Sequence, residues 1–252
     1  MYGITAKERK IIEELSKEID IGDDAAWFPF GNKFLVFSAD LIHEKTHLLP
    51  NMSLKQFGKL AVTVNLSDVA AMGARPLAFL LSYASPDIEL KKFQEILNGV
   101  KEQCEKFNLK FAGGDTNEFP EGREITLGGS ILGFMREKPL LRSQAKVGDL
   151  LGVTGILGAS FGIDLLLQGK KIFPSYREIV KKALEPEPRV REGIILAKYA
   201  HSAIDISDSL AVSLYSLAHQ SKLGIEVNLE KLPLPKLDLD ILNYALYGGG
   251  DY

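Results

Sequence analysis

An aspartate in the middle of a long apolar segment is the strongest constraint on how this chain folds. Asp68 lies within "AVTVNLSDVAAMGA", residues 61–74, where most neighbours are apolar or small. The surrounding residues 53–73 have the pattern of a helix that begins at a serine cap and ends at a glycine. A carboxylate inside such a helix is buried, which costs several kcal/mol unless a cation meets it. The fold is therefore expected to bring a cation to Asp68.

Further aspartates share one feature with Asp68: each lies beside glycine, serine or alanine, at or near a junction of two expected elements. They are Asp24, Asp40, Asp115, Asp205 and Asp208. Helix caps and tight turns explain any one of them separately. Taken together, and with few Lys or Arg residues nearby in the sequence, they indicate bound cations.

The available ligand types favour a hard cation. The chain has one cysteine, Cys104, and four histidines, so Mg²⁺ is expected before zinc or iron. Magnesium is bound by carboxylate oxygens and is commonly shared with substrate phosphates, which predicts kinase-like chemistry on a nucleotide or another polyphosphate. No G-x-x-x-x-G-K-[ST] phosphate loop is present. Acid–base catalysis by paired carboxylates, as in glycoside hydrolysis, is the alternative, but it uses fewer aspartates.

Composition excludes several other kinds of partner. Thirty Lys plus Arg against 33 Asp plus Glu leave a net charge of −3, so no basic excess indicates a nucleic-acid surface. No apolar run approaches the roughly 20 residues of a membrane span. A single cysteine excludes an internal disulfide framework and is typical of a reducing compartment. We expect a cytoplasmic protein that binds neither nucleic acid nor membranes.

Apolar periodicity predicts alternating strands and helices in the first half of the chain. A first helix is expected after a cap at Thr5, with Glu8 at capping-box spacing. Strands are expected at 33–40, 76–86, 109–115 and 124–135, and helices at 53–73 and 89–107. A polar loop containing His43 and His47 is expected after the first of these strands. Trp27 and Phe28 are expected in the core.

The second half begins after a charged stretch, residues 136–148, in which the apolar pattern lapses. We interpret it as the connection between an N-terminal domain, 1–137, and a C-terminal domain, 138–252. Strands are expected in the second domain at 149–155, 202–206 and 224–229, with helices at 175–184, up to 199 and after 208. The sequence ends at "YGGGDY" without a closing element, so we expect a truncated domain whose last residues are poorly ordered unless a sheet holds them.

A set of short motifs resembles, in order and in approximate spacing, those of thiamine-monophosphate kinases. They are "GDDAA", "SAD" followed by His47, "NLSDVAAMGARP", "GGDT", "LLRSQAKVGD", "DISDSL" and "GGGDY". That family is similar to aminoimidazole ribonucleotide synthetase, selenophosphate synthetase and a hydrogenase maturation factor. The resemblance covers essentially the whole chain. It implies an α/β (α+β) fold of two domains, with a mixed sheet in the first and a second α/β domain, and a homodimer in which the sheet pairs with its copy.

The resemblance also implies a reaction and the residues that serve it. The γ-phosphate of ATP would pass directly to thiamine monophosphate, giving thiamine diphosphate, with several Mg²⁺ ions and without a general base or a covalent intermediate. The implied magnesium ligands are Asp24, Ser38, Asp40, Asp68, Asp115, Asp205 and Asp208. The implied ATP contacts are Gly114, Asp115, Arg142 and Ser207, and the implied contact of thiamine phosphate is His47.

This chain departs from the family motifs at two positions. The family has glycine where this chain has Ser209, and a substrate-binding glutamate where this chain has Gly250. The second departure predicts weak binding of thiamine monophosphate. In the double aspartate, we expect Asp24 to point inward and Asp23 to face solvent or cap its own turn. The alternatives are another ATP-dependent enzyme of the superfamily and a nucleotide-binding protein without turnover.

Overall fold

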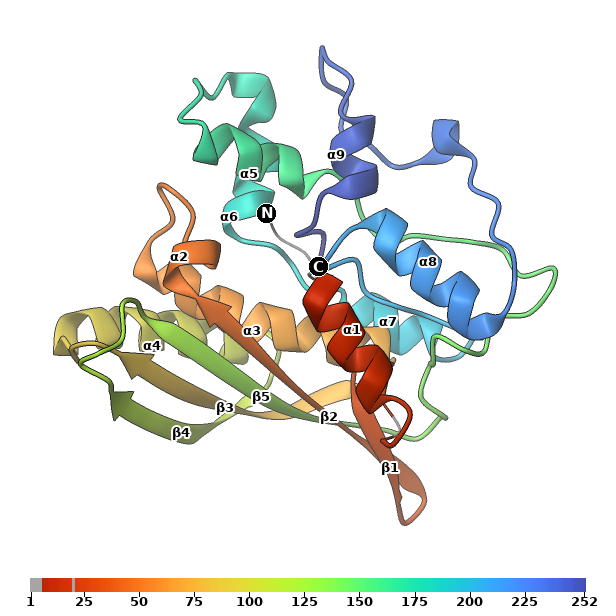
Figure 1. Ribbon diagram of the computed structural model, residues 1–252, viewed down its shortest axis with the longest axis horizontal. Helices are drawn as coiled ribbons and strands as arrows, with labels where there is room; N and C mark the ends of the chain where they lie inside the picture. Colours follow the sequence, from red (N-terminus) through yellow and green to blue (C-terminus); the bar gives the residue numbers. More distant parts are fainter. Residues whose placement is uncertain (1–5, 20) are drawn as a thin grey trace.

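A five-stranded mixed sheet organises the first half of the structure, a computed structural model that describes residues 6–19 and 21–252 (Figure 1). Its strands are β1 (Ala26–Phe30), β2 (Lys33–His43), β3 (Arg75–Ser85), β4 (Lys110–Glu118) and β5 (Thr126–Met135), in the order β1-β2-β5-β3-β4. Strands β3 and β4 are parallel, because a helix returns the chain between them, and the other neighbours are antiparallel.

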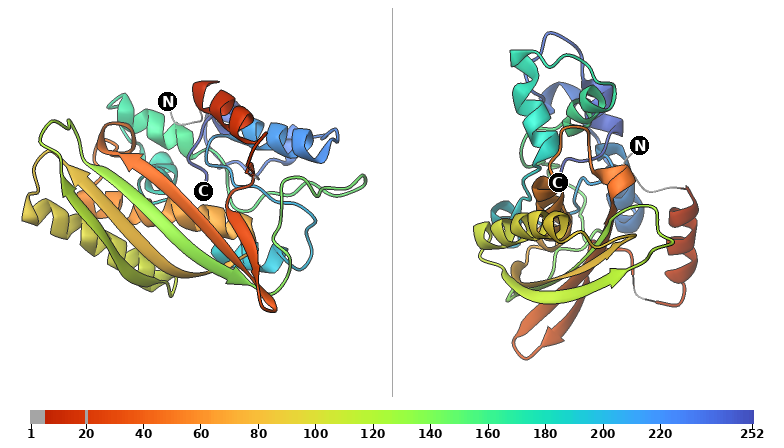
Figure 2. Two further views of the ribbon diagram at one scale, coloured as in Figure 1. Left: turned by 60° about the horizontal axis from the view of Figure 1, so that its bottom comes forward. Right: turned by 90° about the vertical axis from the view of Figure 1, so that its left-hand side faces the viewer.

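Two helices cover one face of this sheet, as Figures 1 and 2 show. Helix α3 (Leu54–Ala71) begins at Ser53, whose side chain forms the predicted serine cap in a capping box with Gln56. Helix α4 (Leu90–Lys106) packs closely on α3. A Cβ atom at Gly99 would lie 1.9 Å from the carbonyl oxygen of Lys55, so only glycine permits this approach. Both helices were predicted within three residues of their bounds.

The opposite face of the sheet carries exposed apolar side chains. Phe37 and Leu41 of β2 are 45% and 56% exposed, and Leu80 of β3 is 45% exposed. The prediction that Trp27 and Phe28 belong to the core is wrong, since both are exposed. They lie on β1, an edge strand that pairs only with β2 and whose residues are all exposed.

Strand β2 is longer than predicted. It continues past Asp40 to His43, because Asp40 to His43 pair with Thr126 to Gly129 of β5. The short helix α2 (Glu44–His47) then replaces the expected polar loop. Strand β1 was not predicted.

The first helix, α1 (Ala6–Leu15), forms as predicted, with its apolar residues facing outward. Ile11 and Leu15 are 59% and 43% exposed. The predicted cap at Thr5 and the side chain of Glu8 lie outside the described residues. No helix in the described part of the chain is long and apolar enough to cross a membrane.

The second half is built from helices joined by extended segments. The helices are α5 (Ala159–Leu167), η1 (Pro174–Tyr176), α6 (Arg177–Leu184), α7 (Val190–Leu196), α8 (Leu210–Ser221), η2 (Leu229–Lys231) and α9 (Leu242–Tyr247). The three strands predicted here are wrong, since residues 138–252, all described, contain none. A strand requires a hydrogen-bonded neighbour, and Leu150, in the first of these segments, is 97% exposed.

Candidate metal and phosphate site

Three carboxylates from distant parts of the chain meet where the two halves join. Oxygen atoms of Asp24, Asp68 and Asp205 all lie within 4.8 Å of one another. Asp24 precedes β1, Asp68 lies in the last turns of α3, and Asp205 precedes α8. Like charges at this separation repel strongly unless a cation or a proton is present.

Asp68 is held by strand β2. The hydroxyl of Ser38 donates a hydrogen bond to Oδ2 of Asp68. Because alternate residues of a strand share a face, Ser38 and Asp40 both lie on the side of the sheet that α3 covers. Burial, and then the charges of Asp40, Asp205 and Asp24, raise the pKa of Asp68 well above its ordinary value. The predicted need for a cation at Asp68 therefore has a physical basis in the structure.

Asp205 is held by hydroxyl groups. Ser67 of α3 donates to its Oδ2 at 2.9 Å, and Ser207 donates to its Oδ1 at 3.1 Å. The hydroxyl of Ser213 in α8 donates to its backbone carbonyl at 2.6 Å. Burial, and then the charge of Asp24, raise the pKa of Asp205 to about 7, against which these hydroxyl groups act.

Two further predicted ligands lie beside the cluster. Asp40 is exposed as a residue, yet desolvation of its carboxylate, and then the charge of Asp208, raise its pKa. Asp208 is thus close enough to act on Asp40. The next residue, Ser209, caps α8 by accepting the N–H of Val212 at 3.2 Å. Its φ of 175° is ordinary extended backbone, so serine replaces the glycine of the family motif without strain.

Arg142 forms a two-pronged contact with Asp24. Its Nη2 lies 2.6 Å from Oδ1 of Asp24, and its Nε lies 3.4 Å from Oδ2. Burial lowers the pKa of Arg142, but the charges of Asp24, Asp205 and Asp23 outweigh burial and raise it. The backbone N–H of Arg142 donates to Oδ1 of Asp23 at 2.7 Å. Asp24 points inward as predicted, whereas Asp23 binds the connecting segment rather than solvent or its own turn.

His47 ends helix α2, and its ring is oriented by local hydrogen bonds. Nδ1 accepts the backbone N–H of His43 at 3.1 Å and lies 2.7 Å from Oγ1 of Thr46. Burial lowers the pKa of His47, which favours the neutral ring at pH 7. Since Nδ1 is an acceptor, the proton of the neutral ring is on Nε2, and the ring is a hydrogen-bond donor there.

Gly114 and Asp115 do not join the cluster. They lie on β4, and the pairings from Asp40 to Gly129, Gly129 to Leu81, and Leu81 to Gly114 cross three strand spacings. Asp115 is therefore about 14 Å from Asp40, at about 4.8 Å per spacing. The sequence indicated six aspartates of one kind, and the structure separates this one because β5 and β3 lie between β2 and β4.

The last residues of the chain pack beside the acidic cluster. The N–H of Gly250 donates to the carbonyl of Ser207 at 2.8 Å, and Gly250 has a φ of +95°, which favours glycine. Asp251 is buried, accepts the N–H groups of Gly158 and Ala159 at the start of α5 at 2.8 and 3.1 Å, and forms an ion pair with Lys182. A helix, rather than the expected sheet, holds this terminus.

Several of these contacts were absent from the sequence prediction. Ser67, Ser213, Asp251 and Lys182 belong to no chemical pattern along the chain. Ser67 and Asp205 are 138 residues apart, and Lys182 and Asp251 are 69 apart. The one available signal was that Ser67 is a second polar residue next to Asp68 in an apolar segment.

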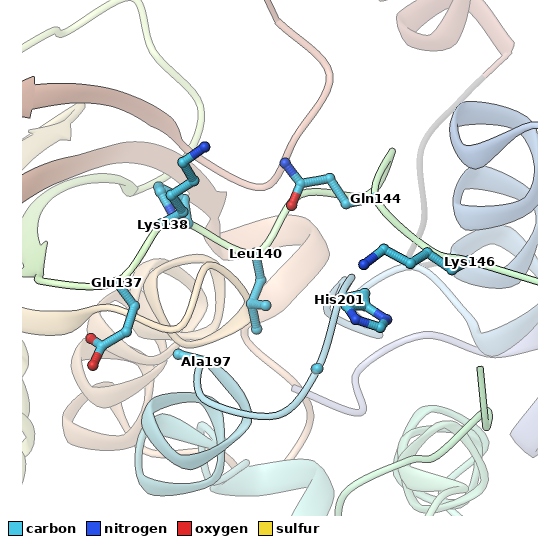
Figure 3. Close-up of a pocket in the computed structure, with 9 residues that line it drawn as sticks. Glu137, Lys138, Leu140, Gln144, Lys146, Ala197 and His201 are labelled. Carbon is cyan, nitrogen blue, oxygen red and sulfur yellow. The ribbon is translucent and has the colours of Figure 1, made fainter. Parts of the chain in front are cut away.

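A separate hollow of about 450 Å³ lies beside the connecting segment (Figure 3). Lys138, Gln144, Lys146 and His201 line it, and none of the predicted site residues does. His201 is fixed there by Asp149, with Nδ1 2.9 Å from Oδ1. The acidic cluster is thus defined by its charges rather than by an enclosed cavity.

The acidic cluster fits a magnesium ion by the chemistry of its donors. Asp24, Asp68 and Asp205 offer carboxylate oxygens, and Ser38 adds a hydroxyl close to them. Oxygen donors of this kind suit Mg²⁺. The raised pKa values of Asp68 and Asp205 mark a place where added positive charge is favourable.

Comparison with known proteins first defines the class. The family described as AIR synthase related protein, N-terminal domain, matches residues 22–135, which contain the whole five-stranded sheet. The fold is therefore that of a protein related to AIR synthase, and the predicted mixed α/β class is confirmed.

Comparison with longer relatives then defines the family. The thiamine-monophosphate kinase of Pyrococcus horikoshii is 39% identical over 98% of this chain and 80% of its own length. That of Buchnera aphidicola subsp. Acyrthosiphon pisum is 40% identical over 97% of this chain and 77% of its own. The solved structure of AaThiL complexed with AMPPCP and TMP matches with a TM-score of 0.89 at 30% identity, covering 100% of this chain and 85% of the other. The chain belongs to the thiamine-monophosphate kinase family.

Proposed function

We propose that this chain transfers the γ-phosphate of ATP directly to thiamine monophosphate, producing thiamine diphosphate. The convergence of Asp24, Asp68 and Asp205 within 4.8 Å carries this proposal. It occurs in a family of ATP-dependent kinases, one solved member of which holds AMPPCP and TMP. An acidic cluster with oxygen donors suits a reaction between two phosphate groups.

Charge repulsion is the obstacle to this reaction. The acceptor is a phosphate oxygen that is already anionic at neutral pH, so neither a general base nor a covalent intermediate is needed. Magnesium supplies positive charge between the donor and acceptor phosphates. Asp24, Asp68 and Asp205 would hold it, with Ser38, Asp40 and Asp208 as further ligands. The hydroxyls of Ser67 and Ser207 keep the Asp205 carboxylate in place.

Two cleft ends follow from the remaining contacts. Arg142 has the planar fork that binds phosphate oxygens in pairs, and we assign it to ATP together with Ser207 and Gly114. The Nε2–H of His47 would donate to the phosphate of thiamine monophosphate. Asp115 lies about 14 Å from Asp40, at three strand spacings. We therefore assign it to ATP and to a separate magnesium ion.

The assembly and the location are part of the same proposal. We propose a cytoplasmic homodimer in which the open sheet face, with Phe37, Leu41 and Leu80 exposed, is covered by a second copy. We also retain the predicted boundary between residues 137 and 138. Light scattering tests the dimer: Leu41→Lys should yield monomers, and a monomeric wild type would contradict it.

A coupled assay tests the reaction. The chain is incubated with ATP, Mg²⁺ and thiamine monophosphate, and thiamine diphosphate is identified by ³¹P NMR. Aminoimidazole precursors and selenide serve as competing acceptors for the other superfamily reactions. Formation of thiamine diphosphate that depends on Asp68 supports the proposal. Nucleotide binding without turnover on any acceptor would identify a binding protein instead.

A further inference from the structure

Arg142 has two partners that it cannot serve fully at once. In the proposed function it binds phosphate, yet in the structure its guanidinium is engaged with the carboxylate of Asp24. We propose that Arg142 takes the place of a cation at Asp24 while no metal is bound, and exchanges Asp24 for the nucleotide phosphates when the metal enters. This inference rests on the proposed function for the identity of the two ligands.

The geometry gives Arg142 the position of a substitute cation. Both oxygens of Asp24 face it, at 2.6 Å from Nη2 and 3.4 Å from Nε. The Asp24 side chain is 1% exposed, so without this partner it would be a buried, uncompensated charge. Asp24 is also one of the three carboxylates that could share an ion. A divalent cation and a guanidinium on the same carboxylate repel each other, because they lie a few ångströms apart in a poorly solvated place.

The side chain can make this exchange while its backbone stays fixed. The N–H of Arg142 is held by Asp23 at 2.7 Å, and its carbonyl accepts the hydroxyl of Ser221 at 2.7 Å. The Arg142 side chain is 21% exposed and has a flexible stem. Rotation of that stem therefore moves the guanidinium without any movement of the two halves of the molecule.

The exchange couples the two ligands. Metal without nucleotide must displace Arg142 and leave its charge beside the ion, whereas phosphate provides the guanidinium with a new partner. Nucleotide without metal must take Arg142 from Asp24 and leave that carboxylate uncompensated. Each ligand therefore removes the cost that opposes the other, and coupling of this kind is reciprocal.

The test measures each ligand in the absence of the other. Mn²⁺ is titrated into the nucleotide-free chain and followed by electron paramagnetic resonance, and ATP is titrated calorimetrically in excess EDTA. In Arg142→Gln we expect Mn²⁺ to bind at least about tenfold more tightly and ATP at least about tenfold more weakly, within the usual range of coupling between sites. Arg142→Lys, which keeps the charge but loses the fork, should lie between wild type and Arg142→Gln for both ligands.

Shifts of opposite sign distinguish exchange from damage to the site. Loss of affinity for both ligands in Arg142→Gln, or unchanged Mn²⁺ affinity, would overturn the proposal. Lys146→Gln is the matched control, since it removes a positive charge from the same connecting segment but on the side of the hollow in Figure 3, and should change both affinities by less than about twofold. The kinase assay is read separately: opposite shifts in a chain that fails to phosphorylate thiamine monophosphate would refute the proposed function and leave the exchange standing.

Discussion

Asp68 and Asp205 meet in one cluster, but the two halves of the molecule hold them in different ways. Asp68 is part of an 18-residue helix packed on a closed sheet, so its backbone is fixed by the core. Asp205 lies in an extended segment without a strand partner, and serine hydroxyls from α3, its own turn and α8 fix it. The first half provides a rigid wall of the site, and the second half is attached to that wall by polar contacts.

The apolar contacts between the halves show the same asymmetry. Helix α7 reaches α3 through Gly193, where a Cβ atom would lie 2.1 Å from the carbonyl oxygen of Ala70. The core of buried side chains is continuous from the sheet into α5 and α6. Changing one half at a time therefore separates contributions to chemistry from contributions to docking.

The largest effect is expected from Asp68→Asn in the rigid half. It removes the charge at the centre of the cluster, and phosphoryl transfer should fall at least about a hundredfold, as when one electrostatic stabiliser of a transition state is lost. Steady-state kinetics with thiamine monophosphate measure it. Glu102→Gln is the control, since Glu102 is an exposed acid of the same half that pairs with Lys55 and Lys59 on α3. Activity of Asp68→Asn within threefold of wild type would exclude a metal-binding function for Asp68.

Gly193→Ala should break the docking of the second half. The added methyl group meets backbone 2.1 Å away, which α7 can relieve only by moving off α3. We expect the free energy of unfolding to fall by about 2 kcal/mol, measured by urea titration. Gly224→Ala, where an added Cβ meets nothing within 4 Å, is the control and should change it by less than about 0.5 kcal/mol. Equal stabilities of the two variants would show that α7 is not a tight contact.

His47→Ala and Arg142→Ala should separate the two ends of the cleft. A hydrogen bond to a charged group contributes about 1.5 kcal/mol or more, so each variant should weaken one ligand about tenfold. His47→Ala should affect thiamine monophosphate and leave ATP nearly unchanged, and Arg142→Ala should do the reverse. Calorimetric titration of both ligands measures this in the presence of Mg²⁺. Similar losses for both ligands in both variants would mean that the ends are misassigned.

The smallest effect concerns the pH dependence of stability without metal. Asp205 keeps its proton up to a pKa of about 7 in the folded chain, whereas the unfolded chain releases it near 3.8. The folded state thus binds more protons between these values, so this group's contribution to stability is full below pH 3.8 and is lost as the pH rises to about 7. In EDTA, the melting temperature of wild type relative to Asp205→Asn should fall by a few degrees from pH 4.5 to 7. A constant difference would contradict the raised pKa.

Sequence patterns predicted the first half better than the second for a physical reason. Strands β2, β3 and β5 and helices α3 and α4 have regular apolar spacing because one layer buries the other. Edge strand β1 buries little on either face, so its aromatic residues resembled a core segment. In the second half, apolar alternation at 149–155 and 224–229 predicted strands, but strand formation depends on a neighbour that local pattern does not specify.

The site was predictable in its residue types but not in its internal pairing. Charge in an apolar segment identified Asp68, and the ordered motifs identified Asp24, Asp205 and Arg142. The pairing of Arg142 with Asp24 joins residues 118 apart, and sequence reasoning had no rule for it. Asp115 was grouped with the others because its neighbours were similar, while strand order places it across the sheet.

The ion pair of Asp251 with Lys182 has a consequence for the order in which the chain folds. Asp251 bonds the first turn of α5 across 93 residues, whereas the five-stranded sheet is complete once Met135 has been made. Contacts that close long loops form late, because the chain must lose more freedom to make them. During synthesis the sheet and its two helices can settle while the rest is still being made, whereas the start of α5 waits for a residue added more than 90 steps later. Until then, the growing chain has one wall of its site and lacks the contact that closes the other.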